Sequence, residues 1–190
     1  MNDIAISATS HVTEADLKSA RLGPRFGRLD LASQLALLAV ENLGVNFELL
    51  PRDRVAICLA AKAGSLTTDV EFWRGRAAVG GPSPTLFAYT LPSAAIGEIA
   101  IRHRLTGPNL CFVGDGREVL TEAMDLLRRR EADGCVCVYV EVISATAGEL
   151  IQQPPVASAC AVFLQRDDVK QTVTGEFDRD IKAVCANLRP

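Results

Sequence analysis

The stretch LTGPNLCFVGDG, residues 105–116, decides the fold. Residues 109–113 form a mostly apolar run of strand length, and this run leads into Gly114-Asp115-Gly116. A helical pattern follows over residues 117–130. A strand that meets a helix through a tight glycine turn is a place where many enzymes position a nucleophile. The stretch therefore predicts a strand–turn–helix unit, and its turn is the first candidate for a catalytic site.

The rest of the chain alternates between strand-like and helix-like patterns. Strands are predicted at residues 2–8, 54–61, 109–113, 134–142 and 154–164. A short extended segment at 169–174 follows the last strand, and helices are expected at residues 14–20, 30–44, 68–73, 93–105, 117–130 and 177–188. In the clearest helix Asp30 is a suitable N-cap and Gly44 a suitable end. This alternation predicts a single α/β domain over residues 1–190.

Composition narrows the class of partner. The 190 residues are 48% hydrophobic and 23% charged, with a formal net charge of −3. No basic patch is visible, so we expect no nucleic-acid partner. No apolar run reaches the roughly 20 residues of a membrane span, and the N-terminus lacks the pattern of a signal peptide. We therefore expect a cytoplasmic protein without membrane contact.

The chain has six cysteines, which are expected to be reduced thiols in the cytoplasm. Four lie in apolar runs, where cysteine packs as a small hydrophobe: Cys58, Cys135, Cys137 and Cys160. The apolar run at residues 134–142 places Cys135 and Cys137 on the same face of a strand. A zinc site would need a second pair of ligands, and the sequence has none with suitable spacing. We expect neither a metal nor another cofactor.

Several stretches together resemble the N-terminal half of β-ketoacyl synthases, which have the thiolase fold. They are FGRLDLASQLALLAVENLG (26–44), RVAICLAAKAGSLTTDVEFWRG (54–75), SPTLFAYTLPSAAIGEIAIRHRLTGPNL (83–110), DGCVCVYVEV (133–142) and PPVASACAVFL (154–164). The third stretch is the most specific. The resemblance covers residues 26–166 and implies a single half of a thiolase-type fold, a mostly parallel five-stranded sheet with helices on both faces. Active members join two such halves, pair subunits through the catalytic strand, and condense an acyl group on a cysteine with a malonyl unit on acyl carrier protein.

The resemblance also implies where the nucleophilic cysteine of the family falls, at the first turn of the helix after the Gly107-Pro108 strand. The positions available there are Gly114, Asp115, Gly116 and Arg117, and none of them can form a thioester. In the family, the histidines and the lysine come from the second half of the subunit, and we expect this chain not to include that half. The resemblance thus implies a truncated, catalytically incompetent relative.

Three residues remain as candidates for chemistry. Cys111 lies mid-strand, roughly 13 Å before Asp115, too far from the helix N-terminus to be activated by it. Asp115 and Glu118 have the spacing of a capping box, although Asp115 could also act as a general base. His103 lies near a helix end, where an imidazole readily meets exposed carbonyl groups. We expect a structural role for each, and catalysis is the alternative.

Three functions follow as hypotheses. The first is a catalytically inactive subunit, related to chain-length factors, that forms a homodimer or a heterodimer with a ketoacyl synthase through the strand Asn109, Leu110, Cys111, Phe112 and Val113. The second is an acyltransferase or synthase component that uses Cys111 or a site shared with a partner. The third is a module that binds an acyl chain or acyl carrier protein with the residues Phe87, Tyr89, Arg102 and Arg104.

Overall fold

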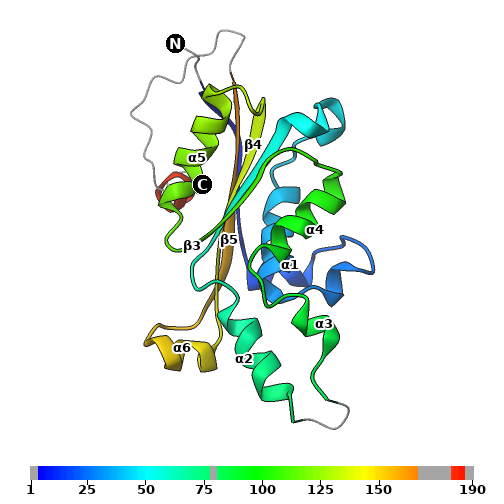
Figure 1. Cartoon of the computed structure of the whole chain (residues 1–190), viewed down its shortest axis with the longest axis vertical. Helices are drawn as coiled ribbons and strands as arrows, with labels where there is room; N and C mark the ends of the chain where they lie inside the picture. Colours follow the sequence, from blue (N-terminus) through cyan, green and yellow to red (C-terminus); the bar gives the residue numbers. More distant parts are fainter. Residues whose placement is uncertain (1–3, 78–80, 167–180, 187–190) are drawn as a thin grey trace.

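The computed structural model describes residues 4–77, 81–166 and 181–186, and its centre is one five-stranded sheet (Figure 1). The strands are β1 (Ile4–Thr13), β2 (Val55–Ala61), β3 (Asn109–Val113), β4 (Gly134–Ile143) and β5 (Val156–Arg166). Their order across the sheet is β1-β5-β4-β2-β3. The pairs β2–β3 and β2–β4 are parallel, whereas β5 is antiparallel to both of its neighbours. Four strands therefore run in one direction, and the sheet is mixed because β5 opposes them.

Helices cover both faces of this sheet, which confirms the predicted α/β class. The helices are α1 (Leu31–Glu41), α2 (Leu66–Gly75), α3 (Pro84–Phe87), α4 (Ala94–His103), α5 (Arg117–Arg128), α6 (Ala145–Ile151) and α7 (Ile181–Ala186). Figure 1 shows α1 and α4 on one face and α5 with α7 on the other, while α2, α3 and α6 lie beyond the carboxyl ends of the strands. None of the described helices is long and apolar enough to cross a membrane.

The two faces of the sheet are packed with side chains of different size. On β2, Ile57 and Leu59 belong to the cluster under α1 and α4, whereas Ala56, Cys58 and Ala60 belong to the cluster under α5. Side chains alternate between faces along a strand, so a continuous apolar run serves both clusters. Small side chains on the second face let α5 approach the sheet closely.

The four cysteines expected in the core are buried there, as predicted. They line the face under α5, where the Cys135 Sγ lies 3.6 Å from the Cys58 Sγ and 3.9 Å from the Cys137 Sγ. The hydrogen bond with Cys135, together with burial, raises the pKa of Cys58, and burial is the main cause that raises the pKa of Cys135. They therefore stay protonated and act as packing groups. Among the described residues, no group of three or more His, Cys, Asp or Glu side chains is placed to hold a metal ion.

Most predicted elements appear at the expected positions. Strand 109–113 matches β3 at both ends, and α1 begins directly after its predicted cap Asp30 but ends at Glu41, before Gly44. The helices α3 and α6 were not predicted. The expected terminal helix over 177–188 is described only as α7, and the extension at 169–174 lies outside the described residues.

Candidate functional site

The turn between β3 and α5 is built by two glycines with positive φ angles. Gly114 has φ 149° and Gly116 has φ 85°, backbone conformations that L side chains rarely adopt. Gly116 is itself the N-cap of α5, and it has no side chain that could accept a hydrogen bond. The predicted capping box is therefore wrong, because the left-handed Gly116 moves the cap one residue past Asp115. Instead, the Asp115 carboxylate lies 3.0 Å from the Arg117 Nε and 3.4 Å from the Arg117 backbone N–H.

The space beside this turn is already filled. A Cβ atom at Gly116 would lie 2.7 Å from the Tyr139 Cδ2 and 3.1 Å from the Ile181 Cγ2. Tyr139 comes from β4, is 3% exposed, and donates its hydroxyl to the Glu141 carboxylate at 3.2 Å. The turn thus leaves no room for a side chain at the position where α5 begins.

The electrostatic environment of the turn is also unsuited to a thiolate. Burial is the main cause that raises the pKa of Tyr139, and the carboxylates of Glu141 and, more weakly, Asp115 add to it. Groups that disfavour a phenolate at this point also disfavour a thiolate, because both are anions in a site of low polarity. Activated cysteines lie instead near cations or open helix N-termini.

The structure does not bring the three predicted candidates for chemistry together. Cys111 is exposed in the middle of β3, and partial desolvation by the surrounding chain raises its pKa. His103 ends α4 before the amino end of β3, where its ring lies 4.7 Å from that of Phe47 and its Nε2 3.7 Å from the Glu41 Oε1. Asp115 follows the carboxyl end of β3. Burial also lowers the pKa of His103, which favours its neutral form.

The outer edge of β3 carries backbone groups that point away from the sheet. On the inner side, the Ile57 N–H donates to the Pro108 carbonyl at 2.9 Å and the Gly114 N–H donates to the Ala61 carbonyl at 3.1 Å. Hydrogen-bonding direction alternates along a strand, so the N–H and C=O groups of Asn109, Cys111 and Val113 face outward. Exposed edges are usually protected by charged side chains. β3 has none.

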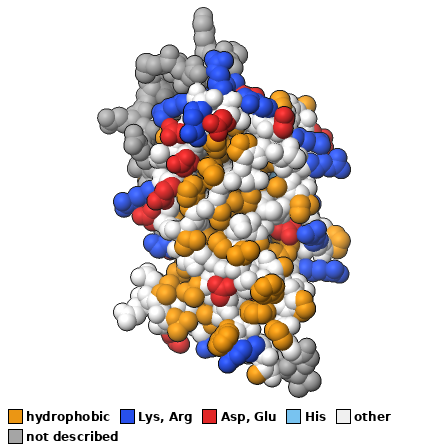
Figure 2. Space-filling model, in the orientation of Figure 1, with side chains coloured by type: hydrophobic (Ala, Val, Ile, Leu, Met, Phe, Trp, Pro, Cys, Tyr) orange, Lys and Arg blue, Asp and Glu red, His pale blue; other side chains and the backbone are white. Residues whose placement is uncertain are grey.

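An apolar surface adjoins this edge. Figure 2 shows hydrophobic side chains gathered over the middle and lower part of the face that carries β3. A groove of about 480 Å³ runs beside Val113 at the carboxyl ends of β2, β3 and β4, with Pro92 and Ile151 in its walls. Val113 and Leu91 are each about two-thirds exposed. Lys62 and Asp69 also line the groove, and we call its apolar residues Pro92, Val113 and Ile151 the β3 surface.

The residues predicted to contact an acyl chain or carrier protein come from two elements of the fold. Phe87 and Tyr89 lie at and after α3, where the Phe87 ring is 5.5 Å from that of Phe72. Arg102 and Arg104 lie at the C-terminal end of α4, about 15 Å along that helix from its start. Arg102 is engaged within the fold, at 2.6 Å from the Glu41 carboxylate and 3.0 Å from the Leu22 carbonyl.

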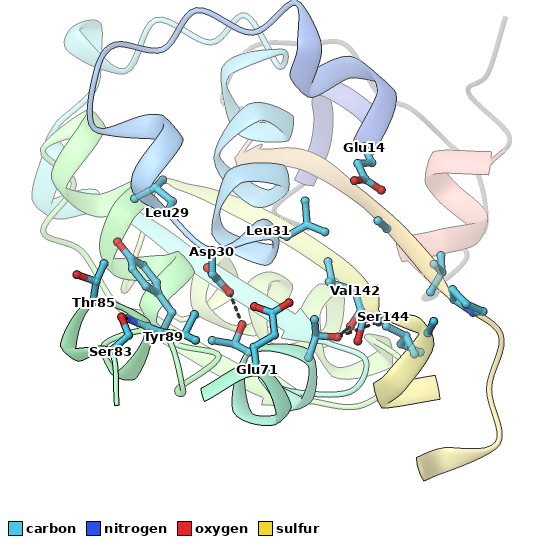
Figure 3. Close-up of a pocket in the computed structure, with 18 of the residues that line it drawn as sticks. Glu14, Leu29, Asp30, Leu31, Glu71, Ser83, Thr85, Tyr89, Val142 and Ser144 are labelled. Atoms are coloured by element: carbon cyan, nitrogen blue, oxygen red, sulfur yellow. Dashed lines mark hydrogen bonds between the residues drawn. The ribbon is translucent and has the colours of Figure 1, made fainter. Parts of the chain in front are cut away.

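A larger cleft of about 700 Å³ was missed by the sequence analysis (Figure 3). It lies between the start of α1, α2 and α3 and the point where β4 ends and β5 begins. Tyr89 lines it, but its hydroxyl donates to Glu98 at 3.2 Å. Asp30 also lines it, and the Asp30 carboxylate accepts from the Ser33 N–H and the Thr68 hydroxyl, each at 3.0 Å. The sequence predicted the capping role of Asp30 but contained no local signal for the cleft, which is assembled from distant segments.

Comparison with solved structures identifies proteins that share this fold, whereas comparison of sequences does not. No family model matches the chain, and no curated protein matches its sequence. The ishigamide ketosynthase/chain length factor aligns with TM-score 0.72 and 18% identity over 90% of this chain and 64% of that one. A ketosynthase, ApeO, in complex with its chain length factor, ApeC, from Xenorhabdus doucetiae aligns with TM-score 0.65 and 16% identity over 87% and 80%.

A third structure, a type II polyketide synthase acyl carrier protein in complex with its ketosynthase, aligns with TM-score 0.71 and 15% identity over 87% of this chain and 63% of that one. The chain has the thiolase-like fold of ketosynthases and chain length factors, as the sequence resemblance implied. It spans less than two thirds of the ishigamide chain. At these identities the likeness establishes the fold, and the activity is a separate question.

Proposed function

We propose that this protein is a ketosynthase-like subunit without a nucleophile of its own, which pairs through β3 with a second subunit in fatty acid or polyketide assembly. The second subunit is either another copy of this chain or a ketosynthase. In this role the protein contributes a surface and a sheet edge, and the partner contributes the chemistry.

The junction of β3 and α5 carries the proposal. Its edge offers three outward-facing pairs of N–H and C=O groups on a strand without charge, beside the β3 surface. Addition of a second strand to such an edge is a recurring mode of recognition, in which backbone hydrogen bonds supply affinity. The edge leads directly into a turn where Tyr139 fills the space next to Gly116. The edge of β3 thus favours pairing with a second strand, and the turn that follows it disfavours acyl transfer.

The aligned structures support the same role. Two describe ketosynthase and chain length factor together, and a third describes a ketosynthase with its acyl carrier protein. A partner with the same fold, and a carrier protein that serves the pair, are the natural partners to test.

Cys111 allows a sharp test of pairing, because its N–H is one of those that face outward. Cys111→Pro removes that donor and blocks the edge while leaving the ladder to β2 intact, since proline is tolerated on the open side of an edge strand. Cys111→Val is the matched control, because it keeps the N–H and the strand preference.

Light scattering after gel filtration should give twice the 20.4 kDa chain mass, or a one-to-one complex with an added ketosynthase. Cys111→Val should retain that complex and Cys111→Pro should lose it, with unchanged circular dichroism. A monomer at every concentration and no complex with a ketosynthase would overturn the proposal. So would a complex that Cys111→Pro leaves intact.

The absence of acyl transfer needs its own measurement. Incubation with acyl-coenzyme A or acylated carrier protein, alone and with the partner, should leave the intact mass of this chain unchanged. The alternative is an acyltransferase that uses Cys111, the one described thiol exposed on the surface. A thioester adduct that disappears in Cys111→Val would establish that alternative.

A further inference from the structure

The 700 Å³ cleft shown in Figure 3 has the size of a small-molecule site and is separate from the surface that carries the proposed pairing. No residue of β3 or α5 lines it. A ligand there would not compete with a second strand at β3, so this inference does not rest on the proposed function.

One wall of the cleft is apolar and well supported. It is made by the end of β4 and the start of β5, where Val142 pairs with Ala157 and Ile143 with Val156, and by Leu31 at the start of α1. The Thr67 hydroxyl fixes α2 to this wall, since it donates to the Val142 carbonyl at 3.2 Å and accepts from the Ser144 N–H at 3.0 Å. The wall is therefore preformed and can cover an aliphatic group.

The lining of the cleft also carries negative charge. Three carboxylates line the space, from Glu14, Asp30 and Glu71, against one cation, Arg28. Figure 3 shows Asp30 and Glu71 next to each other and Glu14 across from them. Thr68, one helical turn before Glu71, is hydrogen-bonded to Asp30, which holds the two carboxylates on the same side.

Glu71 is available to a ligand. Within residues 4–77, 81–166 and 181–186, the Glu71 side chain has no hydrogen-bond or ion-pair partner, whereas Asp30 is held by two donors. Among the described residues, Asp30 accepts hydrogen bonds from an N–H and a hydroxyl and has no cation as an ion-pair partner. A ligand with a positive group would meet two carboxylates there, and an anionic ligand would be repelled.

We infer that the cleft binds a small organic cation with an aliphatic body. The ammonium or guanidinium group lies between Asp30 and Glu71, and the aliphatic part lies over Val142 and Ala157. The two carboxylates favour a ligand with a cationic group, and the apolar wall favours one with an aliphatic chain.

Three probes that share a six-carbon chain and differ in their terminal group test this inference: hexylammonium, hexanol and hexanoate. Titration of the whole chain, followed by amide chemical shifts, should show saturable binding of hexylammonium with shifts at Thr68, Val142 and Ala157. Hexanol should bind more weakly, and hexanoate should give no shifts in the cleft. No saturation by hexylammonium up to high millimolar concentration, or equal binding of all three, would overturn the inference.

Two isosteric variants separate the cleft from general surface charge. Glu71→Gln removes one negative charge from an exposed residue of the cleft, and should weaken hexylammonium binding about three- to fivefold. Glu149→Gln removes the same charge from α6, outside the cleft, and should leave binding unchanged. Equal effects of the two variants would show attraction to overall charge and would overturn the proposed site.

Discussion

The helices α1 and α5 pack on opposite faces of the sheet, and their first turns are held in different ways. At α1, the extended residue Asp30 accepts hydrogen bonds from Ser33 and from Thr68, so a side chain closes the helix and ties it to α2. At α5, the left-handed Gly116 begins the helix without a side-chain cap, and the Tyr139 ring packs against its backbone.

Because of this difference, the N-termini of α1 and α5 can take part in different chemistry. At α1 a carboxylate is anchored at the edge of a cleft, where it can meet a ligand. At α5 the positive end of the helix is the place where an anion could be stabilised, but Tyr139 leaves no room for a side chain there. A strand–turn–helix outline is thus insufficient for a catalytic site, since the packing around the turn decides whether a nucleophile fits.

The largest expected effect comes from adding a side chain at the α5 turn. Gly116→Ala should lower the free energy of unfolding by about 3 kcal/mol, because it combines backbone strain at φ 85° with a Cβ placed 2.7 Å from Tyr139. Urea denaturation, with the midpoint compared at constant m-value, measures the loss.

Gly23→Ala is the matched control for that variant. Gly23 also has a positive φ, 94°, but no atom lies within 4 Å of the position of its Cβ. Its replacement should cost about 1 kcal/mol from backbone strain alone. Equal losses for the two variants would mean that Tyr139 does not fill the turn, and the contrast between the two helix starts would fail.

Local signals explain which parts of these two turns could be predicted. The Asp30 cap and strand 109–113 follow from adjacent residues, and both were predicted correctly. The spacing of Asp115 and Glu118 led to a wrong prediction of the N-cap, because spacing alone does not reveal that Gly116 has a left-handed backbone conformation. The contact of Tyr139 with Gly116 is set by the pairing of β4 in the sheet, and no short pattern encodes it. Cleft residues were missed for the same reason.

A second pair of variants compares the two acidic residues at the helix starts. Asp30→Ala should lower the free energy of unfolding by about 2 kcal/mol, from the lost N-cap and the lost bond to the Thr68 hydroxyl. Asp115→Ala should cost under about 0.5 kcal/mol, because the Asp115–Arg117 pair is exposed. Thermal unfolding of both variants at one pH gives the comparison, and a larger loss for Asp115→Ala would reverse our assignment of the caps.

The smallest of the three expected differences is a pH dependence that reports on the Tyr139 ring itself. Because its pKa is raised in the folded protein, Tyr139 keeps its proton there while the unfolded chain releases it above its ordinary value of about 10. The stabilising contribution is therefore complete below pH 10 and is lost as pH rises above it.

Between pH 9 and a pH near 10.7, the wild-type protein should lose about 1 kcal/mol more stability than Tyr139→Phe. The thiols titrate in both proteins and cancel in this difference. Tyr89→Phe, which replaces the other of the two tyrosines, is the control. Its pKa is also raised by burial, but Tyr89 is more exposed, so its effect should be smaller. If the curves of the wild type and Tyr139→Phe remain parallel throughout this range, the ring is not buried against Gly116, and the turn has space for a side chain after all.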